Sequence, residues 1–302
     1  DFVLMRADGS PLYTLAVAVD DVLMKITHVL RGEDLLSSTP RQIRVYQAMG
    51  VKADEFPVFA HLPFVMGQDN AKLSKRNGEV SIAWYRESGF LPEAICNYLA
   101  LLGWSPGDDR EDVSMKELVE LFELERVNSS PARFDMKKLE AINGEKIRKL
   151  TLDDFLSRAL PFLLKDGVVS GIDEEIKVLR QALPIIQERI ARMNEVSAML
   201  KFLFTEQLSF DQEASSALLS DQAQAVIAKS LEVLQGVEDW SHGSIEAKLR
   251  EALIDQMALK PRLAFSPVRI AVTGSHISPP LFESMELLGK QRCITRLKAA
   301  VS

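Results

Sequence analysis

The feature that most constrains the fold is a long succession of helical patterns that starts near residue 150. Apolar residues recur there at helical spacing, and no alternating strand pattern competes with them. An example of this spacing is the set Ile176, Leu179, Leu183 and Ile186. The patterns predict helices at 152–165, 173–183, 184–204, 221–235 and 244–258, followed by two short closing helices. We therefore predict an all-α domain over 151–302, with a softer internal boundary near 205–213.

Two interruptions are expected inside this domain. Pro161 should kink or split the helix over 152–165, because proline removes one helical hydrogen bond and crowds the preceding turn. The stretch KPRLAFSPVR, residues 260–269, is predicted to be an irregular basic patch.

The first 80 residues have an α/β pattern instead. Two apolar runs flank Asp8-Gly9 and predict a hairpin, and a helix is expected from about Leu15 to Met24. The run KITHVLR, residues 25–31, predicts a strand that ends at Arg31. Thr39 as N-cap, Pro40 at the first turn and Gly50 as the stop signal predict the next helix. This order is typical of half of a doubly wound sheet, in which ligands lie beyond the carboxyl ends of the strands.

Residues 81–150 are predicted to be a separate helical region. LPEAICNYLALLG, residues 91–103, is expected to be a buried helix, and Ser114 with Glu117 forms a capping box for the next one. A short helix is expected from Asp135 to Asn143, ended by Gly144.

Composition excludes several classes of protein. The net charge of −7 argues against indiscriminate nucleic-acid binding but allows a local basic face. Two cysteines and four scattered histidines provide neither a zinc-ligand spacing nor a disulfide framework. No apolar run is long enough to cross a bilayer. We therefore expect a cytoplasmic protein with reduced thiols, no metal site and no membrane contact. Because the chain begins at Asp1 within an apolar run, we expect a fragment of something longer.

The most distinctive short motif is KLSKR, residues 72–76, which holds three cations and a hydroxyl. It follows the turn-rich residues 67–71, and these follow an apolar run at 64–66 that predicts a short strand. Lysine and arginine side chains suit phosphate oxygens. Taken alone, the pentapeptide is more simply a solvated basic loop.

Longer stretches carry a resemblance to a known family. KLSKR resembles KMSKS, the second signature of class I aminoacyl-tRNA synthetases. The stretches over 13–42, 59–67, 91–104 and 128–148 are similar to the catalytic half of glutamyl-tRNA synthetases, and 258–290 is similar to the end of the bacterial enzymes. The first class I signature, HIGH, does not occur in the sequence. The resemblance thus implies the C-terminal part of such an enzyme, inactive alone: part of a Rossmann-type catalytic domain over 1–80, a stem-contact region over 81–150 and an anticodon-binding domain.

The resemblance also implies a ligase activity: ATP with Mg²⁺ activates L-glutamate to an adenylate, and the glutamyl group passes to tRNA(Glu). In this interpretation Lys75 is the catalytic cation at the phosphates, and Lys72, Ser74 and Arg76 are further ATP contacts. Phosphoryl chemistry depends mainly on such positioned positive charge.

Arg31 and Tyr13 match the family's contacts to the substrate amino acid, and Arg31 could hold a carboxylate through two hydrogen bonds. The residues alone leave other interpretations open. Arg31 could pair with Glu33, Asp34 or Asp20, and Tyr13 could be packed in the hairpin. His28 and His61 are more simply core histidines than catalysts.

Five cations are candidates for tRNA phosphate contacts: Arg133, Lys137, Lys138, Arg262 and Arg269. Each could equally be an ordinary solvated side chain. The partners expected are ATP, glutamate and tRNA(Glu), with tRNA(Gln) as a further candidate, and we expect a monomer. Two rival interpretations remain: a glutaminyl-tRNA synthetase, which should end in β-barrels, and a tRNA-binding module with no activity of its own.

Overall fold

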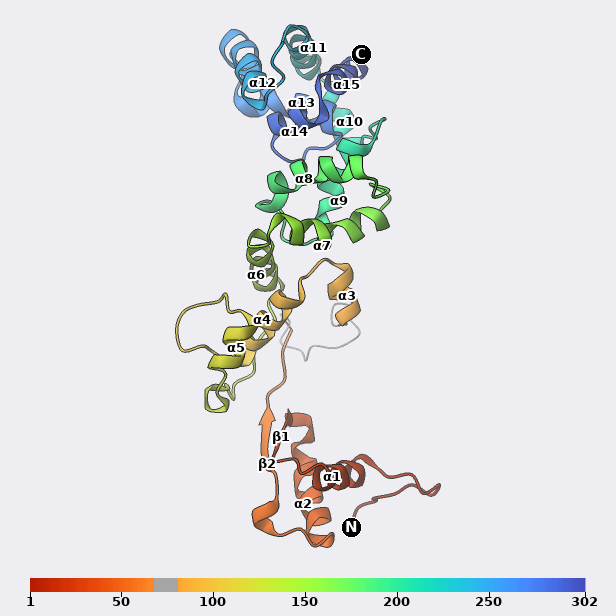
Figure 1. Ribbon diagram of the computed structural model, residues 1–302, viewed down its shortest axis with the longest axis vertical. Helices are drawn as coiled ribbons and strands as arrows, with labels where there is room; N and C mark the ends of the chain where they lie inside the picture. The colour runs from red at the N-terminus through yellow and green to blue at the C-terminus, as the bar shows by residue number, and fades with distance from the viewer. Residues whose placement is uncertain (68–80, 302) are drawn as a thin grey trace. The chain divides into compact units, whose positions relative to one another are not determined.

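The computed structural model describes residues 1–67 and 81–301 and divides the chain into two compact units (Figure 1). The first unit comprises Asp1–Val80 and Cys96–Met136, and the second comprises Ser81–Ile95 and Lys137–Ser302. The region predicted at 81–150 is therefore shared between the units, whereas the division into three functional domains stays a prediction. Within the described residues, no helix has both the length and the apolar composition that crossing a bilayer requires.

The first unit begins with an α/β arrangement. Its elements are α1 (Tyr13–Leu23), β1 (His28–Gly32), the 3₁₀ turn η1 (Glu33–Ser38), α2 (Thr39–Ala48), η2 (Ala53–Glu55) and β2 (Val58–Leu62). The two strands pair in parallel, and the register sets His28 opposite Val58 and Gly32 opposite Leu62. Ala18 of α1 and Val45 and Tyr46 of α2 form the buried core beside this sheet. The predicted α/β start is confirmed.

Two strand predictions change. The turn at Asp8-Gly9 exists, but its flanks form only an isolated bridge between Met5 and Pro11. The short strand predicted at 64–66 was wrong, because the strand in this part of the chain is β2, Val58–Leu62. Met66 instead makes a single parallel bridge to Arg133. The run 58–62 becomes the strand because it finds β1 as a hydrogen-bonding partner, which an apolar pattern alone does not reveal.

The rest of the first unit is a small helical cluster. α4 (Pro92–Gly103) starts in the second unit and continues into the first, where α5 (Met115–Leu121) and the 3₁₀ turn η4 (Leu124–Arg126) follow. The capping box is confirmed: the Ser114 hydroxyl accepts from the Glu117 amide, and the Glu117 carboxylate accepts from the Ser114 amide. Trp104, Val113 and Leu118 form its buried core.

The second unit is built of helices, which confirms the mainly α fold class. Its helices are α3 (Ile82–Glu87), α6 (Met136–Arg148), α7 (Leu152–Lys165), α8 (Asp173–Gln187), α9 (Glu195–Phe204), α10 (Gln212–Leu218), α11 (Asp221–Gln235), α12 (His242–Leu249), the π-helical η5 (Arg250–Gln256), α13 (Pro261–Thr273), α14 (Leu281–Leu288) and α15 (Lys290–Ala300). No strand is assigned within residues 151–301, where a glutaminyl-tRNA synthetase should have β-barrels.

Several predicted helix ends were wrong for a common reason. α6 continues through Gly144, α8 continues through Pro184, and the predicted irregular patch at 260–269 is most of α13. α7 likewise continues through Pro161, so the split was wrong, whereas the kink stays a prediction. In each case buried apolar residues lie on both sides of the supposed breaker, as Phe155 and Leu163 do around Pro161. Packing of a continuous apolar face outweighs a local helix penalty of about 1–3 kcal/mol.

A buried asparagine ties three segments of the second unit together. The Asn143 side-chain oxygen accepts from the Leu91 amide at 2.7 Å, and its amide nitrogen donates to the Ala191 carbonyl at 2.6 Å and to the Gly89 carbonyl at 3.4 Å. The Gly89 carbonyl also accepts from the Met193 amide at 2.9 Å. These bonds hold the turn after α3 against the turn between α8 and α9. Because Asn143, Gly89 and Leu91 are buried, their polar groups would be costly to leave unpaired.

Gly89 is the position at which this junction is most sensitive. Its φ is +83°, and an added Cβ would lie 2.4 Å from the Asn194 nitrogen and 2.6 Å from the Met193 nitrogen. We expect Gly89→Ala to lower the free energy of unfolding, measured by urea denaturation, by roughly 3–5 kcal/mol, since backbone strain and a backbone clash add.

Gly167 provides the matched control, because its φ is +65° and an added Cβ would meet nothing within 4 Å. Gly167→Ala should cost only about 1 kcal/mol, the penalty of the left-handed backbone by itself. Equal losses in the two variants would show that the clash at the junction is unimportant.

Candidate functional site

Arg31 is the centre of a polar cluster at the end of β1. Its Nη2 donates to the Thr39 hydroxyl at 2.8 Å, its Nε donates to His61 Nε2 at 3.3 Å, and its Nη1 lies 3.4 Å from the Tyr13 hydroxyl. The Thr39 hydroxyl is also 3.2 Å from His61 Nε2. Because arginine can only donate, the His61 nitrogen that faces it must be the unprotonated one. Helix α1, strand β1, helix α2 and strand β2 each supply one member of this cluster.

The partners that Arg31 has among the described residues carry no negative charge. Among the described residues, none of the acidic groups that the sequence offered forms an ion pair with it; Glu33, for instance, accepts from the Phe64 amide at 3.3 Å. The guanidinium also lies over the Phe59 ring, 5.5 Å from its centroid. A cation held by neutral groups keeps its charge available, so the cluster is suited to bind an anion such as a carboxylate.

Tyr13 lies at the open side of this cluster. It begins α1 and is 46% exposed, so it is not packed inside a hairpin. Its hydroxyl is one of the Arg31 neighbours, and a molecule bound to Arg31 from solvent would meet it as a second hydrogen-bonding group.

Sequence reasoning missed Thr39 and His61 as members of the site. Thr39 was expected to cap a helix, but the N-cap is Ser38, and the Thr39 hydroxyl faces Arg31 instead. His61 was interpreted as a core residue. A signal for it exists in the strand register, which places His61 opposite Arg31, but this signal depends on knowing that β2 covers 58–62.

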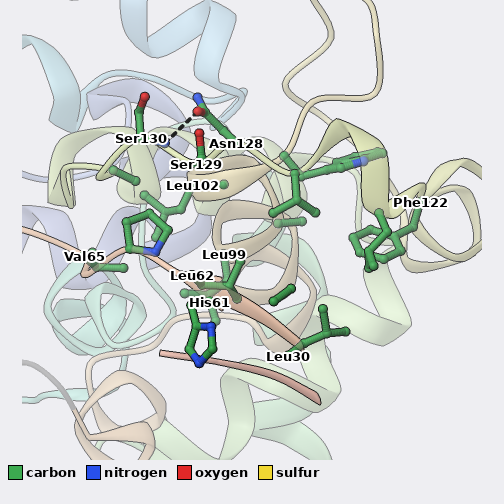
Figure 2. Close-up of a pocket in the computed structure, with 18 residues that line it drawn as sticks. Leu30, His61, Leu62, Val65, Leu99, Leu102, Phe122, Asn128, Ser129 and Ser130 are labelled. Atoms are coloured by element: carbon green, nitrogen blue, oxygen red, sulfur yellow. Dashed lines mark hydrogen bonds between the residues drawn. The ribbon is translucent and has the colours of Figure 1, made fainter. Parts of the chain in front are cut away.

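An apolar cavity of about 470 Å³ lies in the first unit beside His61 (Figure 2). Leu30, Leu62, Leu99 and Phe122 are among its lining residues, with Asn128, Ser129 and Ser130 at a polar edge. The Asn128 side chain there accepts from the Ser130 amide at 2.8 Å. An apolar lining does not compensate a carboxylate or phosphate charge, so the Arg31 cluster, and not this cavity, is the candidate anion site.

The predicted phosphate-binding residues Lys72, Ser74, Lys75 and Arg76 lie outside the described residues. Across residues 1–67 and 81–301, no group of three or more His, Cys, Asp or Glu side chains is placed to hold a metal ion.

The five candidate RNA-binding cations fall on three segments. Arg133 is exposed in the first unit, and Lys137 and Lys138 begin α6 in the second. Arg262 is exposed in the first turn of α13. Arg269, two turns later, donates to the Ser278 hydroxyl at 2.6 Å and to the Pro279 carbonyl at 2.8 Å.

Arg269 also has a cationic neighbour that the sequence did not single out. Burial and, next, the positive charge of Arg189 lower the pKa of Arg269 from its usual value. Arg189 itself is exposed. The positive charges of Arg189 and Arg269 lie close enough to interact, with Glu283 acting on Arg269 in the opposite direction, and such a pair of cations would favour a phosphate nearby.

Thr39 allows a test of the cluster. Thr39→Val removes the hydroxyl that accepts from Arg31 and keeps the side-chain shape, so we expect a loss of about 1–2 kcal/mol in the free energy of unfolding by urea denaturation. In an Arg31→Met background the same substitution should cost almost nothing, because the donor is already absent.

Ser38→Ala is the matched control for helix capping. Ser38 makes no side-chain capping bond, so this change should alter stability by less than about 0.5 kcal/mol. If Ser38→Ala cost as much as Thr39→Val, the loss would reflect the start of α2 and not the Arg31 cluster.

The chain is similar to known proteins over its whole length. Residues 1–141 match the family model "tRNA synthetases class I (E and Q), catalytic domain", and residues 154–301 match "Anticodon binding domain". A glutamate–tRNA ligase of a Nocardioides species is 51% identical over 308 residues, and the match covers 100% of this chain and 62% of that protein. A glutamate–tRNA ligase of Rhodococcus jostii is 51% identical over 305 residues, covering 99% of this chain and 62% of that protein.

Solved structures agree with the sequence relatives. The crystal structure of a glutamate tRNA ligase from Elizabethkingia meningosepticum in complex with its amino acid superposes with a TM-score of 0.80 at 31% identity, covering 100% of this chain and 62% of that one. The chain thus spans about three fifths of the length of these relatives. The two family models match consecutive parts of the chain, and the similarity to glutamate–tRNA ligases extends over its whole length. The chain therefore belongs to the glutamyl-tRNA synthetase family of class I, as a portion that contains catalytic-domain and anticodon-binding-domain sequence.

Proposed function

We propose that the protein to which this chain belongs activates L-glutamate with ATP and transfers the glutamyl group to tRNA(Glu). The observation that carries the proposal is the Arg31 cluster, in which the described partners of the cation are neutral hydrogen-bonding groups, in a chain about 50% identical to glutamate–tRNA ligases. In the reaction a glutamate carboxylate oxygen attacks the α-phosphorus of ATP, the bond to the β-phosphate oxygen breaks, and pyrophosphate leaves. A tRNA hydroxyl then attacks the acyl carbon and releases AMP.

Arg31 holds the substrate in this proposal. Its Nη1 side, near the exposed Tyr13 hydroxyl, is where a carboxylate can enter and accept two hydrogen bonds. Thr39 and His61 hold the guanidinium from its other side and so limit its rotation. A pre-oriented arginine loses less freedom on binding than a free one, which favours both affinity and a defined substrate geometry.

Lys75 is proposed to stabilise the charge that develops on the phosphates, with Lys72, Ser74 and Arg76 as further ATP contacts. Their residue types and the resemblance of KLSKR to the class I signature support this assignment. Mg²⁺ is proposed to enter bound to the phosphates of ATP. Bound in this way, the ion does not need a complete set of protein ligands.

This chain should not catalyse the reaction alone. Across residues 1–67 and 81–301 its sheet has two parallel strands, and apolar residues of both strands are exposed, including Leu30 at 46% and Val58 at 58%. Parallel sheets are normally covered on both faces and need more than two strands to be stable. Because the relatives are longer, we infer that further strands and the remainder of the active site come from sequence outside this chain.

The second unit is proposed to bind tRNA. Arg262 is exposed on α13, and the neighbouring charges of Arg269 and Arg189 create a positive potential in a chain whose net charge is −7. Arg133, Lys137 and Lys138 are proposed as additional phosphate contacts. Binding of tRNA(Gln) in addition to tRNA(Glu) belongs to the same proposal, because phosphate contacts alone do not distinguish the two.

Two assays on the chain as it stands test these assignments. Pyrophosphate exchange with glutamate and ATP should be undetectable, whereas filter binding to tRNA should be measurable at low salt and weaken steeply as salt rises. Arg262→Gln should weaken binding and reduce the slope of log Kd against log salt by about one phosphate contact.

Arg180→Gln is the matched control, because Arg180 is an exposed arginine already paired with Asp153 at 2.7 Å. It should leave the slope unchanged. Strong exchange activity would contradict the need for the missing part, and absence of tRNA binding at low salt would contradict the RNA assignment. If the chain binds tRNA and the complete protein has no exchange activity, the interpretation as a tRNA-binding module without activity would be favoured.

In the complete protein, Lys75→Ala should lower the rate of glutamate activation by about 10²–10³-fold, because a cation at the developing phosphate charge is lost. The Kd for tRNA should stay within about twofold. Lys52→Ala, at an exposed lysine of the same unit, should change neither quantity. Equal losses of activation and tRNA affinity in Lys75→Ala would mean that the KLSKR motif serves RNA instead of ATP.

A further inference from the structure

Two arginines one turn apart on α15 bind the backbone at the end of another helix. Arg292 donates to the Leu203 carbonyl at 2.7 Å and to the Thr205 carbonyl at 2.8 Å. Arg296 donates to the Phe202 carbonyl at 2.8 Å and to the Thr205 carbonyl at 2.6 Å. Its other terminal nitrogen donates to the Val272 carbonyl of α13 at 2.6 Å. The two guanidinium groups therefore make five hydrogen bonds, all to backbone carbonyls.

The acceptors explain why arginine is needed. Phe202, Leu203 and Thr205 lie at the C-terminal end of α9, where carbonyls lack helical partners and carry the negative end of the helix dipole. A planar guanidinium can reach acceptors on two helices at once, whereas a lysine ammonium concentrates its donors at one point.

Arg296 is buried, with 7% of its surface exposed. Neither arginine has an acidic partner in the described part of the chain, so the carbonyls alone compensate the charges. Burial, followed by the neighbouring charge of Arg292, lowers the pKa of Arg296 to about 10, so the group stays charged at neutral pH.

These bonds connect two groups of helices in the second unit. Helices α7, α8 and α9 pack on one another, and α10–α15 form the group that follows in the chain (Figure 1). The two groups also meet where α14 packs on α8. Residues 205–211 link the groups, and Arg292 and Arg296 bind the beginning of that link from the far end of the sequence.

We propose that Arg292 and Arg296 are positioning residues that hold α10–α15 at one orientation relative to α7–α9, so that cations on both groups contact a single tRNA together. Arg189 follows α8 in the first group, and Arg262 and Arg269 lie on α13 in the second. Contacts on a rigid body reinforce each other, because binding one of them brings the others into place. The inference rests on the proposed tRNA binding, whereas the connection between the groups is independent of it.

Three variants of this chain test the proposal: Arg292→Met, Arg296→Met and Arg296→Lys. Lys298→Met is the control, since Lys298 is an exposed cation on the same helix. Hydrogen exchange and calorimetry report the connection between the groups. In Arg296→Met we expect exchange in the segment 202–211 to rise by about tenfold or more, and the thermal transition of the second unit to separate into two. Arg292→Met should raise exchange less, and Lys298→Met should resemble wild type.

The affinity for tRNA tests positioning, measured by filter binding below the first thermal transition. Arg296→Met should raise Kd by about tenfold and leave the slope of log Kd against log salt unchanged, because no phosphate contact is removed. Arg296→Lys should lie between wild type and Arg296→Met, since it keeps the charge but not all three carbonyl bonds. Lys298→Met should change Kd by no more than about twofold.

The outcomes separate the two hypotheses. Unchanged exchange and a single transition in Arg296→Met would overturn the connection. Faster exchange with unaltered Kd would overturn the positioning role. If wild type does not bind tRNA, the proposed RNA function fails, and exchange still decides whether the arginines connect the groups.

Discussion

The parallel pairing of β1 with β2 is the interaction on which the candidate site depends. It sets Arg31 opposite His61, and the chain that leaves β1 brings Thr39 back to the same guanidinium. Tyr13 arrives from the start of α1 on the open side. Arg31 is 8 residues from Thr39, 18 from Tyr13 and 30 from His61 along the chain, so the candidate anion site forms only while the two strands keep this register. Pairing, and not any one residue, determines the chemistry here.

The helical unit depends on a related constraint, which is that buried backbone groups at helix ends need partners. Asn143 forms hydrogen bonds to backbone groups in the turns after α3 and after α8, and Arg292 and Arg296 donate to backbone carbonyls at the end of α9. In both places a long polar side chain is buried because its bonds join segments far apart in the sequence. Such groups define relative orientation, since apolar packing alone tolerates small shifts.

Local signals predicted helices well where they act within one turn. The capping box at Ser114 and Glu117 and the helix over 221–235 were correct because each depends on neighbouring residues. The errors at Gly144, at Pro184 and in the segment 260–269 share a cause: glycine and proline weaken a helix locally, but apolar neighbours on both sides are buried. Burial of several side chains outweighs one unfavourable residue. The site followed the same division, because Arg31 and Tyr13 could be named from sequence whereas Thr39 and His61 could not.

The sequence by itself determined the fold class, the positions of most helices and the family resemblance. Those properties depend on periodicity, caps and long ordered motifs, all of which are written in contiguous residues. Only the tertiary structure decided which strand pairs with β1, that the Thr39 hydroxyl serves Arg31 and not a helix cap, and that two arginines near the C-terminus bind the end of α9. These are contacts between distant residues. Their energies come from register and burial, which no local pattern encodes.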